Sequence, residues 1–194
     1  MIIADEIHAD IVYDTVHHSI GSFEKMMQYC VVLNAPSKTF NIAGLNTSYA
    51  VIPNATLRQS YIEEQNKSGI TNGNPFGIEA LMVAYEEGAF WLEELKHYLK
   101  DNIRYVDTFI TKENLPIIPV KTEATFLMWL DCHALYEKHH DVKNFFIQEA
   151  KLGLNSGLDF GKSGDRFMRL NIAVSREILE EAMQRLLYAY RGRK

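Results

Sequence analysis

The chain has 194 residues, of which 47% are hydrophobic, and its 20 Lys and Arg against 25 Asp and Glu give a formal net charge of −5. This hydrophobic fraction is typical of a globular protein and excludes a mainly disordered chain. The acidic balance offers no basic face to a phosphate backbone, so we expect no nucleic-acid partner.

The short apolar runs and the two cysteines indicate the cellular compartment of the protein. The longest apolar runs, such as residues 126–130, are too short to cross a bilayer, so we expect no contact with a membrane. Cys30 and Cys132 each lie in an apolar stretch, where a reduced thiol packs as a small hydrophobic group. A cytoplasmic protein follows as the expectation.

The first part of the chain alternates predicted strands and helices. Apolar runs at residues 1–4, 28–33 and 48–52 predict strands, and the first two are expected to be buried. Residues with helical spacing follow Pro53, and the sequence Thr-Asn-Gly-Asn-Pro at residues 71–75 predicts a break.

The longest predicted helix covers residues 76–100. Apolar residues recur in it at three- and four-residue steps, Pro75 precedes it, and Asp101 and Asn102 are plausible stop signals. A helix of this length can connect two domains, because it extends for about 37 Å at 1.5 Å per residue. We therefore expect a domain boundary in its last turns.

The second part of the chain is a mixed α/β pattern. Strands are predicted at residues 117–120, 125–131 and 167–174, and helices at 142–152 and 178–190. Ser175 has acidic residues behind it and is the expected N-cap of the last helix. The fold class predicted for the whole chain is α/β.

Two polar clusters follow the first two predicted strands. Residues 5–8 (DEIH) come directly after the first strand, and residues 37–39 (SKT) follow the second. Functional groups of open α/β sheets lie beyond the carboxyl ends of the strands. If the two strands are parallel neighbours, Asp5 and Lys38 therefore face the same crevice.

Asp5 and Lys38 are a chemically useful pair. A lysine whose pKa is lowered by burial or by neighbouring cations attacks carbonyl groups and forms a Schiff base. A carboxylate suits the pyridinium nitrogen of pyridoxal 5'-phosphate (PLP). The spacing alone leaves open that Lys38 is a solvated loop residue and that Asp5 forms a turn.

Longer sequence strings resemble the signatures of one family. They lie at residues 5–13 (DEIHADIVY), 35–45 (APSKTFNIAGL), 123–131 (EATFLMWLD) and 167–173 (FMRLNIA). In order and spacing they resemble the PLP-dependent carbon–sulfur lyases of the cystathionine β-lyase and cystalysin type. This family belongs to the fold type I, aminotransferase class I/II group.

The resemblance implies a division of the chain. Residues 1–95 would be the C-terminal part of the PLP-binding large domain, with a mainly parallel sheet and the long interdomain helix. Residues 96–194 would form the small C-terminal α/β domain. Family members are longer, so the chain resembles a truncated C-terminal half with impaired cofactor binding.

The resemblance also assigns roles to five residues. Lys38 matches the lysine that holds PLP covalently and moves the substrate's α-proton, and Asp5 matches the aspartate on the pyridine nitrogen. Arg169 matches the arginine that grips the substrate's α-carboxylate, which suits its planar fork. Ser37 lies where family members place part of the phosphate environment. His8 occupies the position of a cofactor-binding tyrosine in many aminotransferases and favours the lyase branch.

One departure concerns the phosphate of PLP. Many aminotransferases carry a phosphate-binding arginine beyond the lysine. Here the chain reads Gly44-Leu45-Asn46, and the nearest downstream arginine is Arg58. Phosphate binding would have to come from elsewhere.

The function implied by the resemblance is β-elimination on a sulfur amino acid, which converts cystathionine or cysteine to a thiol, pyruvate and ammonia. The expected partners are this small-molecule substrate and a second polypeptide, either in a homodimer or by association through an exposed sheet surface. Two alternatives stay open. The first is an aminotransferase of the same family, and the second is a non-catalytic fragment that acts only by association with another polypeptide.

Other polar and aromatic residues have simpler interpretations. Histidines and acidic residues cluster near Asp5 and near Cys132, but their spacing matches no zinc pattern, so no metal site is expected. The pairs at residues 17–18 and 139–140 are expected to be solvent-facing loop histidines. Trp129 and the phenylalanines at residues 145–146 are expected in the core. Without the family match, Arg169 could equally serve a structural carboxylate.

Overall fold

The computed structural model describes residues 1–69 and 73–192. The chain divides into two compact units, Met1–Lys96 and His97–Lys194, and each of them contains its own β-sheet. The α/β fold class is confirmed.

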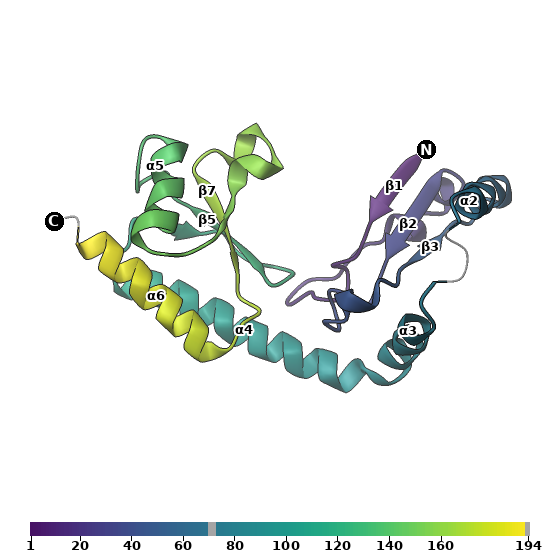
Figure 1. Ribbon diagram of the computed structural model, residues 1–194, viewed down its shortest axis with the longest axis horizontal. Coiled ribbons are helices and arrows are strands. Elements are labelled where there is room, and N and C mark those ends of the chain that lie inside the picture. The colour runs from purple at the N-terminus through teal and green to yellow at the C-terminus, as the bar shows by residue number, and fades with distance from the viewer. Residues whose placement is uncertain (70–72, 193–194) are drawn as a thin grey trace. The chain divides into compact units, whose positions relative to one another are not determined.

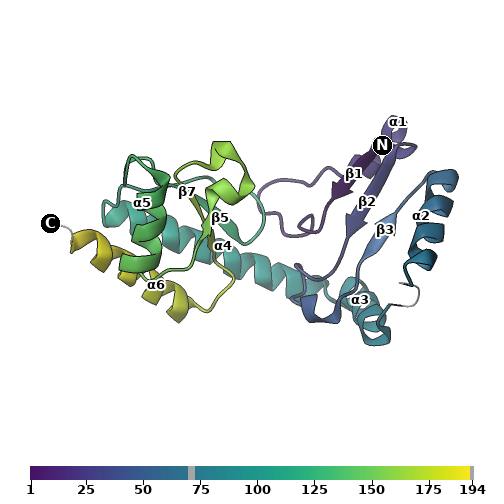
Figure 2. The ribbon, with the colours of Figure 1, turned by 45° about the horizontal axis from the view of Figure 1, so that its top comes forward.

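The first unit contains a three-stranded sheet in the order β1-β2-β3, with the strands β1 (Ile2–Asp5), β2 (Cys30–Asn34) and β3 (Tyr49–Val51). β1 and β2 are parallel, as the sequence predicted, with Asp5 opposite Leu33. β3 is antiparallel to β2, so the sheet is mixed rather than mainly parallel. Figures 1 and 2 show the three strands side by side.

The two parallel strands differ in burial. β2 is buried through Cys30, Val31 and Val32, as predicted, but β1 is largely exposed, with Ile3 at 62%. The expectation of a buried β1 is wrong for this chain. β1 is the edge of the sheet, and the described residues leave most of its surface uncovered.

The helices of the first part differ from the predicted single long helix. They are α1 (Glu24–Met27), α2 (Ala55–Lys67), α3 (Pro75–Glu87) and α4 (Ala89–Lys112). Figure 2 shows α2 beside β3. The helix predicted at residues 76–100 is interrupted at Gly88. A Cβ atom at Gly88 would overlap the carbonyl oxygen of Ala84 and the ring of Phe40, so the tight passage there requires glycine.

Side chains explain the start of α3 and the continuation of α4. Asn74 caps α3, because its Oδ1 accepts a hydrogen bond from the amide of Phe76 at 3.1 Å, and Pro75 starts the helix as predicted. Residues 71 and 72 of the predicted break lie outside the described residues. α4 does not stop at Asn102, whose buried side chain donates to the carbonyl oxygen of Ile172 at 2.9 Å.

The second unit contains a four-stranded antiparallel sheet in the order β4-β5-β7-β6. Its strands are β4 (Ile118–Pro119), β5 (Leu127–Asp131), β6 (Asn155–Ser156) and β7 (Phe167–Asn171). The sequence predicted β4, β5 and β7 but missed β6, which has only two residues.

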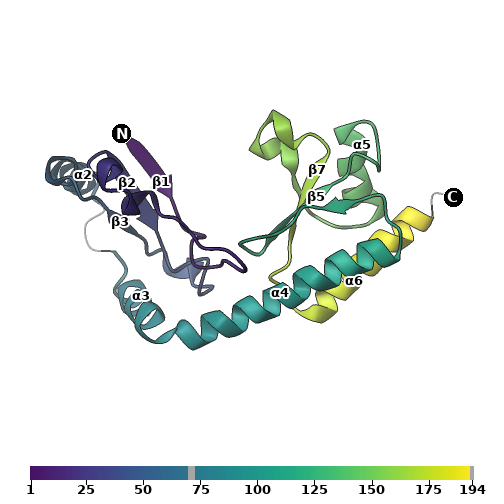
Figure 3. The same ribbon diagram turned by 180° about the vertical axis from the view of Figure 1, so that it is seen from behind.

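Helices of the second unit pack along this sheet. α6 (Arg176–Arg191) runs beside the second half of α4 in the same direction (Figure 3). Arg176 lies over the ring of Tyr105, with its Cζ 4.8 Å from the ring centroid, and Arg191 pairs with Glu113 at 2.6 Å. The predicted cap is confirmed, because Ser175 Oγ accepts a hydrogen bond from the amide of Ile178 at 3.5 Å.

The helix predicted at residues 142–152 is divided in two. α5 (His139–Asn144) starts earlier than predicted and continues into a π-helical turn, η3 (Phe145–Glu149). Phe145 and Phe146 are fully buried, as expected for core residues.

Two short 3-10 helices, η4 (Gly157–Phe160) and η5 (Lys162–Gly164), connect β6 to β7. Two others, η1 (Ile20–Ser22) and η2 (Ala43–Leu45), lie in the first unit.

Cys30 and Cys132 are buried free thiols. Burial and the nearby charge of Asp131 raise the pKa of Cys132 to about 12, so its thiol is inert. In the described part of the chain, no helix is both long and apolar enough to span a bilayer.

Candidate functional site

Two consecutive carboxylates at the end of β1 have different surroundings. Asp5, the last residue of β1, is exposed, and its Oδ1 accepts a hydrogen bond from the amide of Ile7 at 3.2 Å. His8 lies in the turn that follows and is half-buried. The end of β1 thus presents a carboxylate and an imidazole near the carboxyl edge of the sheet.

Glu6 is a structural anchor that the sequence did not reveal. Its side chain is 9% exposed, and its oxygens lie 2.9 Å from His17 Nε2, 3.0 Å from Ser19 Oγ and 3.0 Å from the amide nitrogen of Ile20. Burial alone would raise the pKa of Glu6, but these hydrogen bonds and the charge of His17 lower it below its ordinary value of 4.5. The ionised carboxylate therefore holds the loop around residues 17–20.

The segment after β2 carries the predicted lysine. Residues 36–39 form a turn, which is closed by the hydrogen bond from the amide of Phe40 to the carbonyl oxygen of Pro36 at 2.8 Å. Ser37 is half-buried and Lys38 is exposed. The Lys38 amine makes no hydrogen bond or ion pair with the described residues. The burial that would activate a lysine is therefore not provided by this part of the chain.

A partly buried hydrogen bond joins the two segments. Thr39, which is fully buried, donates through Oγ1 to Asp10 Oδ2 at 2.8 Å. Because β1 and β2 are parallel neighbours, both segments also start at the same edge of the sheet. The structure therefore brings together the two segments that carry Asp5 and His8 on one side and Ser37 and Lys38 on the other. The sequence analysis placed Thr39 in a polar cluster but assigned no role to Thr39 or Asp10.

Arg58 does not replace the missing phosphate-binding arginine. Its Nη1 donates to the carbonyl oxygen of Ile52 at 2.7 Å and to that of Pro53 at 3.2 Å. These contacts tie α2 to the end of β3, so the guanidinium serves the fold of the first unit.

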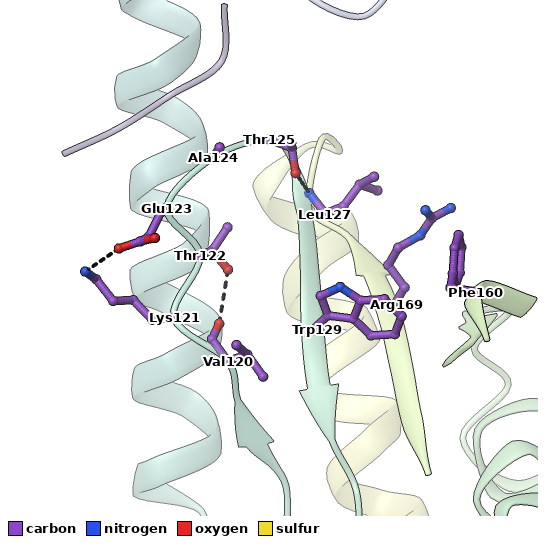
Figure 4. A pocket seen from close by; sticks show the side chains of 10 residues that line it. All are labelled: Val120, Lys121, Thr122, Glu123, Ala124, Thr125, Leu127, Trp129, Phe160 and Arg169. Carbon is purple, nitrogen blue, oxygen red and sulfur yellow. Dashed lines mark hydrogen bonds and ion pairs between the residues drawn. The ribbon is translucent and has the colours of Figure 1, made fainter. Parts of the chain in front are cut away.

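Arg169 lies in the second unit, in a pocket of about 350 Å³ that is open on one side. Figure 4 shows its side chain extending from β7 toward the ring of Phe160, with Trp129 on the neighbouring strand. The lining residues are Val120, Lys121, Thr122, Glu123, Ala124, Thr125, Leu127, Trp129, Phe160 and Arg169. Trp129 therefore lines a pocket, and the expectation that it is simply a core residue is wrong.

The Arg169 guanidinium is held by uncharged groups. Its Nη2 donates to Asn155 Oδ1 at 3.1 Å, and its Cζ lies 4.2 Å from the centroid of the Phe160 ring. Its Nε is buried and has no hydrogen-bond partner in the part of the chain that the structure describes. A buried guanidinium donor without an acceptor favours an anionic ligand, and a carboxylate matches the planar fork.

The predicted site residues divide between the two units. Asp5, His8, Ser37 and Lys38 belong to the first unit and Arg169 belongs to the second. Within residues 1–69 and 73–192, no three His, Cys, Asp or Glu side chains gather in a way that could hold a metal ion.

One histidine has a different environment from the one expected. His139 is 10% exposed, and it bonds the hydroxyl of Ser156 through Nε2 and the amide of Arg166 through Nδ1, both at 2.8 Å. The prediction of a solvent-facing loop histidine is wrong at this position.

Residues 1–186 match the family described as aminotransferase class I and II. The chain belongs to this family. This membership confirms the resemblance found in the motifs, and the fold type I class follows from it and from the solved structures described next.

Several known proteins are similar to this chain. The chain is 32% identical to cystathionine beta-lyase PatB of Bacillus subtilis over 95% of its own length, and 30% identical to protein MalY of Escherichia coli over 98%. It is also similar to the crystal structure of cystalysin from Treponema denticola, which contains a PLP cofactor, with a TM-score of 0.95 and 30% identity.

The chain spans about half the length of the relatives it matches. It covers 48% of PatB, 49% of MalY and 50% of the cystalysin chain, and all of this chain is covered in the last comparison.

Proposed function

We propose that this chain is part of a PLP-dependent carbon–sulfur lyase that acts on a sulfur amino acid. The observation that carries the proposal is the placement of Asp5 at the end of β1 and of Lys38 beyond the end of the parallel strand β2, with the segments after the two strands joined by the Thr39–Asp10 hydrogen bond. Membership of the aminotransferase class I and II family and similarity to cystathionine beta-lyase PatB support it.

The side chains present fit PLP by their chemistry. PLP offers an aldehyde carbon, a pyridine nitrogen, a phenolic oxygen and a phosphate. A primary amine at Lys38 suits the aldehyde carbon, a carboxylate at Asp5 the pyridine nitrogen, an imidazole at His8 the phenolic oxygen, and a hydroxyl at Ser37 the phosphate. The Lys38 amine has no partner in the described part of the chain that would compete for this role.

When bound, the cofactor supplies an electron sink for the negative charge that develops at the substrate's α-carbon. The chain's own residues do the rest. Arg169 binds the α-carboxylate and fixes the orientation of the substrate. The Lys38 amine accepts the proton from Cα, and the negative charge of Asp5 keeps a proton on the pyridine nitrogen.

The bond changes balance without an external oxidant. The electron pair of the broken Cα–H bond forms a Cα–Cβ double bond, and the electron pair of the Cβ–S bond leaves with sulfur as a thiolate, which takes up a proton. Hydrolysis of the remaining enamine consumes one water and gives pyruvate and ammonia. Cystathionine and cysteine both carry sulfur on Cβ and are the proposed substrates.

The chain offers few groups that could bind the phosphate of PLP. Ser37 is the one proposed phosphate ligand, because the Arg58 guanidinium already donates to backbone carbonyl groups. We therefore propose that the 194 residues are a truncated form of a longer enzyme, that they bind PLP weakly alone, and that they associate with a second polypeptide or as a homodimer.

The cofactor assignment is tested by reductive trapping. The full chain is incubated with PLP and treated with borohydride, and the modified peptide is identified by mass spectrometry. We expect the pyridoxyl group on Lys38 in preference to the exposed Lys67, because Asp5, Ser37 and His8 are the proposed cofactor ligands beside Lys38. Lys38→Arg should lose the label, whereas Lys67→Arg should keep it. Equal labelling of all surface lysines would refute the assignment.

An aminotransferase of the same family is the second candidate function, because the matched family includes this activity by its description. His8 favours the lyase, because many aminotransferases have a cofactor-binding tyrosine at this position. The complemented enzyme, in which the rest of a relative's chain is supplied, should release pyruvate from L-cystathionine without an added keto acid. A requirement for a keto acid would identify the aminotransferase, and the absence of both reactions would leave only the non-catalytic fragment.

The setting proposed for this activity is the cytoplasm. Cys30 and Cys132 are buried as free thiols, which suits a reducing compartment. Cell fractionation with an antibody to this chain tests the location.

A further inference from the structure

Arg169 lies in the middle of a row of three side chains on adjacent strands. Asn155 of β6 is directly opposite Arg169 of β7, and Trp129 of β5 is opposite it on the other side. Residues that face each other in neighbouring strands point to the same side of the sheet. The row therefore places an amide and an indole on either side of the guanidinium.

Phe160 completes the surroundings of Arg169. Its ring lies under the guanidinium, with 4.2 Å from the ring centroid to Cζ, and it packs edge-on against Trp129 at 5.4 Å between ring centroids. A cation over an aromatic face is stabilised electrostatically. Phe160 thus contacts both the arginine and its cross-strand neighbour.

The segment that carries Asn155 and Phe160 is held in place at both ends. Ser156, on the opposite face of β6, is buried and bonds His139 Nε2 at 2.8 Å. His139 Nδ1 accepts from the backbone amide of Arg166, so the ring proton is on Nε2 and is donated to the Ser156 hydroxyl. This histidine links β6 to α5 and to the residues just before β7.

The other end of the segment is closed by two glycines. A Cβ atom at Gly157 would overlap the carbonyl oxygen of Gly164, and a Cβ at Gly164 would overlap the backbone of Gly157. This close approach shapes the loop between residues 157 and 164, which carries Phe160. The contact therefore fixes the ends of the loop that carries the Phe160 ring.

We propose that Asn155 and Phe160 are positioning residues for Arg169. They hold the guanidinium in one orientation. Its buried Nε–H then has no acceptor in the described part of the chain and can donate to the carboxylate of a ligand. Both residues are neutral, so they orient the cation without cancelling its charge. The inference rests on the proposed function, in which Arg169 binds the α-carboxylate of the substrate.

The neutrality of Asn155 gives a sharp prediction. Asn155→Asp has nearly the same shape but places a carboxylate on Nη2, where Asn155 Oδ1 now lies at 3.1 Å. This internal anion would compete with the ligand. Asn155→Ala only releases the guanidinium. If Asn155 had only a structural role, Asn155→Asp would weaken ligand binding less than Asn155→Ala, because it keeps the shape of the side chain. If Asn155 positions the guanidinium without neutralising it, Asn155→Asp weakens binding more than Asn155→Ala.

The experiment uses the full chain labelled with ¹⁵N and sodium acetate as the carboxylate probe. Because Arg169 Nε is buried, its N–H exchanges slowly with water and gives an NMR signal, which is assigned by its loss in Arg169→Lys. We expect acetate to shift this signal saturably and sodium chloride at equal ionic strength to leave it unchanged.

We expect Asn155→Asp to weaken acetate binding by about tenfold or more, because a charged acceptor binds the guanidinium more strongly than an amide does. Asn155→Ala should have a smaller effect. Phe160→Leu should weaken binding by about threefold, because it removes the cation–π contact. Phe160→Tyr keeps the ring and should bind acetate like the unaltered chain. Unchanged backbone amide signals elsewhere confirm that each variant is folded.

The outcomes separate the inference from the proposed function. Unaltered acetate binding in Asn155→Asp and Phe160→Leu would overturn the positioning roles and leave Arg169 as the carboxylate site. If the unaltered chain does not bind acetate, both the role of Arg169 and this inference fail, while the trapping of PLP at Lys38 still reports on the cofactor. Asn155→Asp and Phe160→Tyr preserve shape, so the test does not depend on variants that lose packing.

Discussion

Two adjacent carboxylates at the end of β1 have opposite surroundings. Asp5 is exposed and has one local amide contact, whereas Glu6 is buried against three donors from residues 17–20. Successive side chains of an extended segment point to opposite sides, which separates the two groups. One carboxylate is left available for a ligand while its neighbour stabilises the loop.

The lowered pKa of Glu6 predicts a pH-dependent contribution to stability. A carboxylate whose folded pKa is below its unfolded value stabilises the fold above that unfolded value, and the contribution is lost as the pH falls through the folded pKa. We therefore expect Glu6→Gln to lower the free energy of unfolding by about 1.5 kcal/mol at neutral pH, and to have little effect in acid below the pKa of Glu6. Urea unfolding of both proteins at the two pH values measures this.

The contrast with Asp5 provides the control for Glu6. Asp5→Asn should change stability much less, because Asp5 is exposed and only one local amide donates to it. An effect of Glu6→Gln that is equal at neutral and acid pH would show that the carboxylate acts by packing and not by charge.

Sequence motifs identified the polar residues of the candidate site but not those that support them. Asp5, Lys38 and Arg169 stand in strings that are specific to one family. Asn155 and Phe160 contact Arg169 only because of a strand register and a loop closure, which no local pattern encodes. Thr39 likewise depends on the parallel pairing of β1 and β2.

At the scale of elements, the chain between residues 75 and 112 shows how one contact divides a helix. The apolar spacing continues across Gly88, so the pattern predicts a single helix. The structure ends α3 at Glu87 and starts α4 at Ala89, because Phe40 packs directly against Gly88. Phe40 directly follows the turn that carries the candidate lysine, so the helix break lies against the end of this turn.

Gly88→Ala tests this contact. We expect a loss of about 2 kcal/mol in the free energy of unfolding, because the added methyl group overlaps both the Ala84 carbonyl oxygen and the Phe40 ring. Thermal unfolding followed by circular dichroism measures the change. Gly44→Ala is the matched control, because a Cβ at Gly44 meets nothing within 4 Å. A Gly88→Ala protein as stable as the unaltered chain would refute the role of the contact.

Elements defined by a local pattern were predicted from the sequence, whereas elements defined by contacts with distant residues were not. Long periodic segments such as α6 and bounded apolar runs such as β2 and β5 were found from the sequence within a few residues. β6 has two residues and no periodicity, so only its pairing with β7 defines it. The continuation of α4 past Asn102 depends on the backbone of Ile172, which is distant in the sequence.

At the scale of the whole molecule, each unit has a core of its own, and the edge strand of the first unit exposes large apolar side chains. On the edge strand β1, Ile3 is 62% exposed, and Met1, which precedes the strand, is 78% exposed. In the described residues β1 pairs with β2 alone. Unpaired strand edges with apolar side chains favour pairing with other polypeptides. This supports the association proposed above.

Ile3→Lys tests association through β1. We expect the sedimentation coefficient of the unaltered chain to rise with protein concentration, and the lysine to reduce this rise because a charge on an edge strand opposes pairing. Tyr188→Lys is the control, since Tyr188 is 76% exposed but lies on helix α6. Equal effects of both substitutions would show that association does not require the strand edge.

The contact between Gly157 and Gly164 makes the length of the loop between them independent of the surrounding sheet. The backbone meets itself at these two residues, so the stretch between them is an excursion whose ends are already joined. Gly161, at the far side, has a φ of 122°, a backbone conformation that favours glycine. Insertions or exchanges at the other positions of this loop would alter what borders the arginine while β6 and β7 keep their alignment, which gives evolution or a protein engineer a way to change ligand preference without rebuilding the sheet.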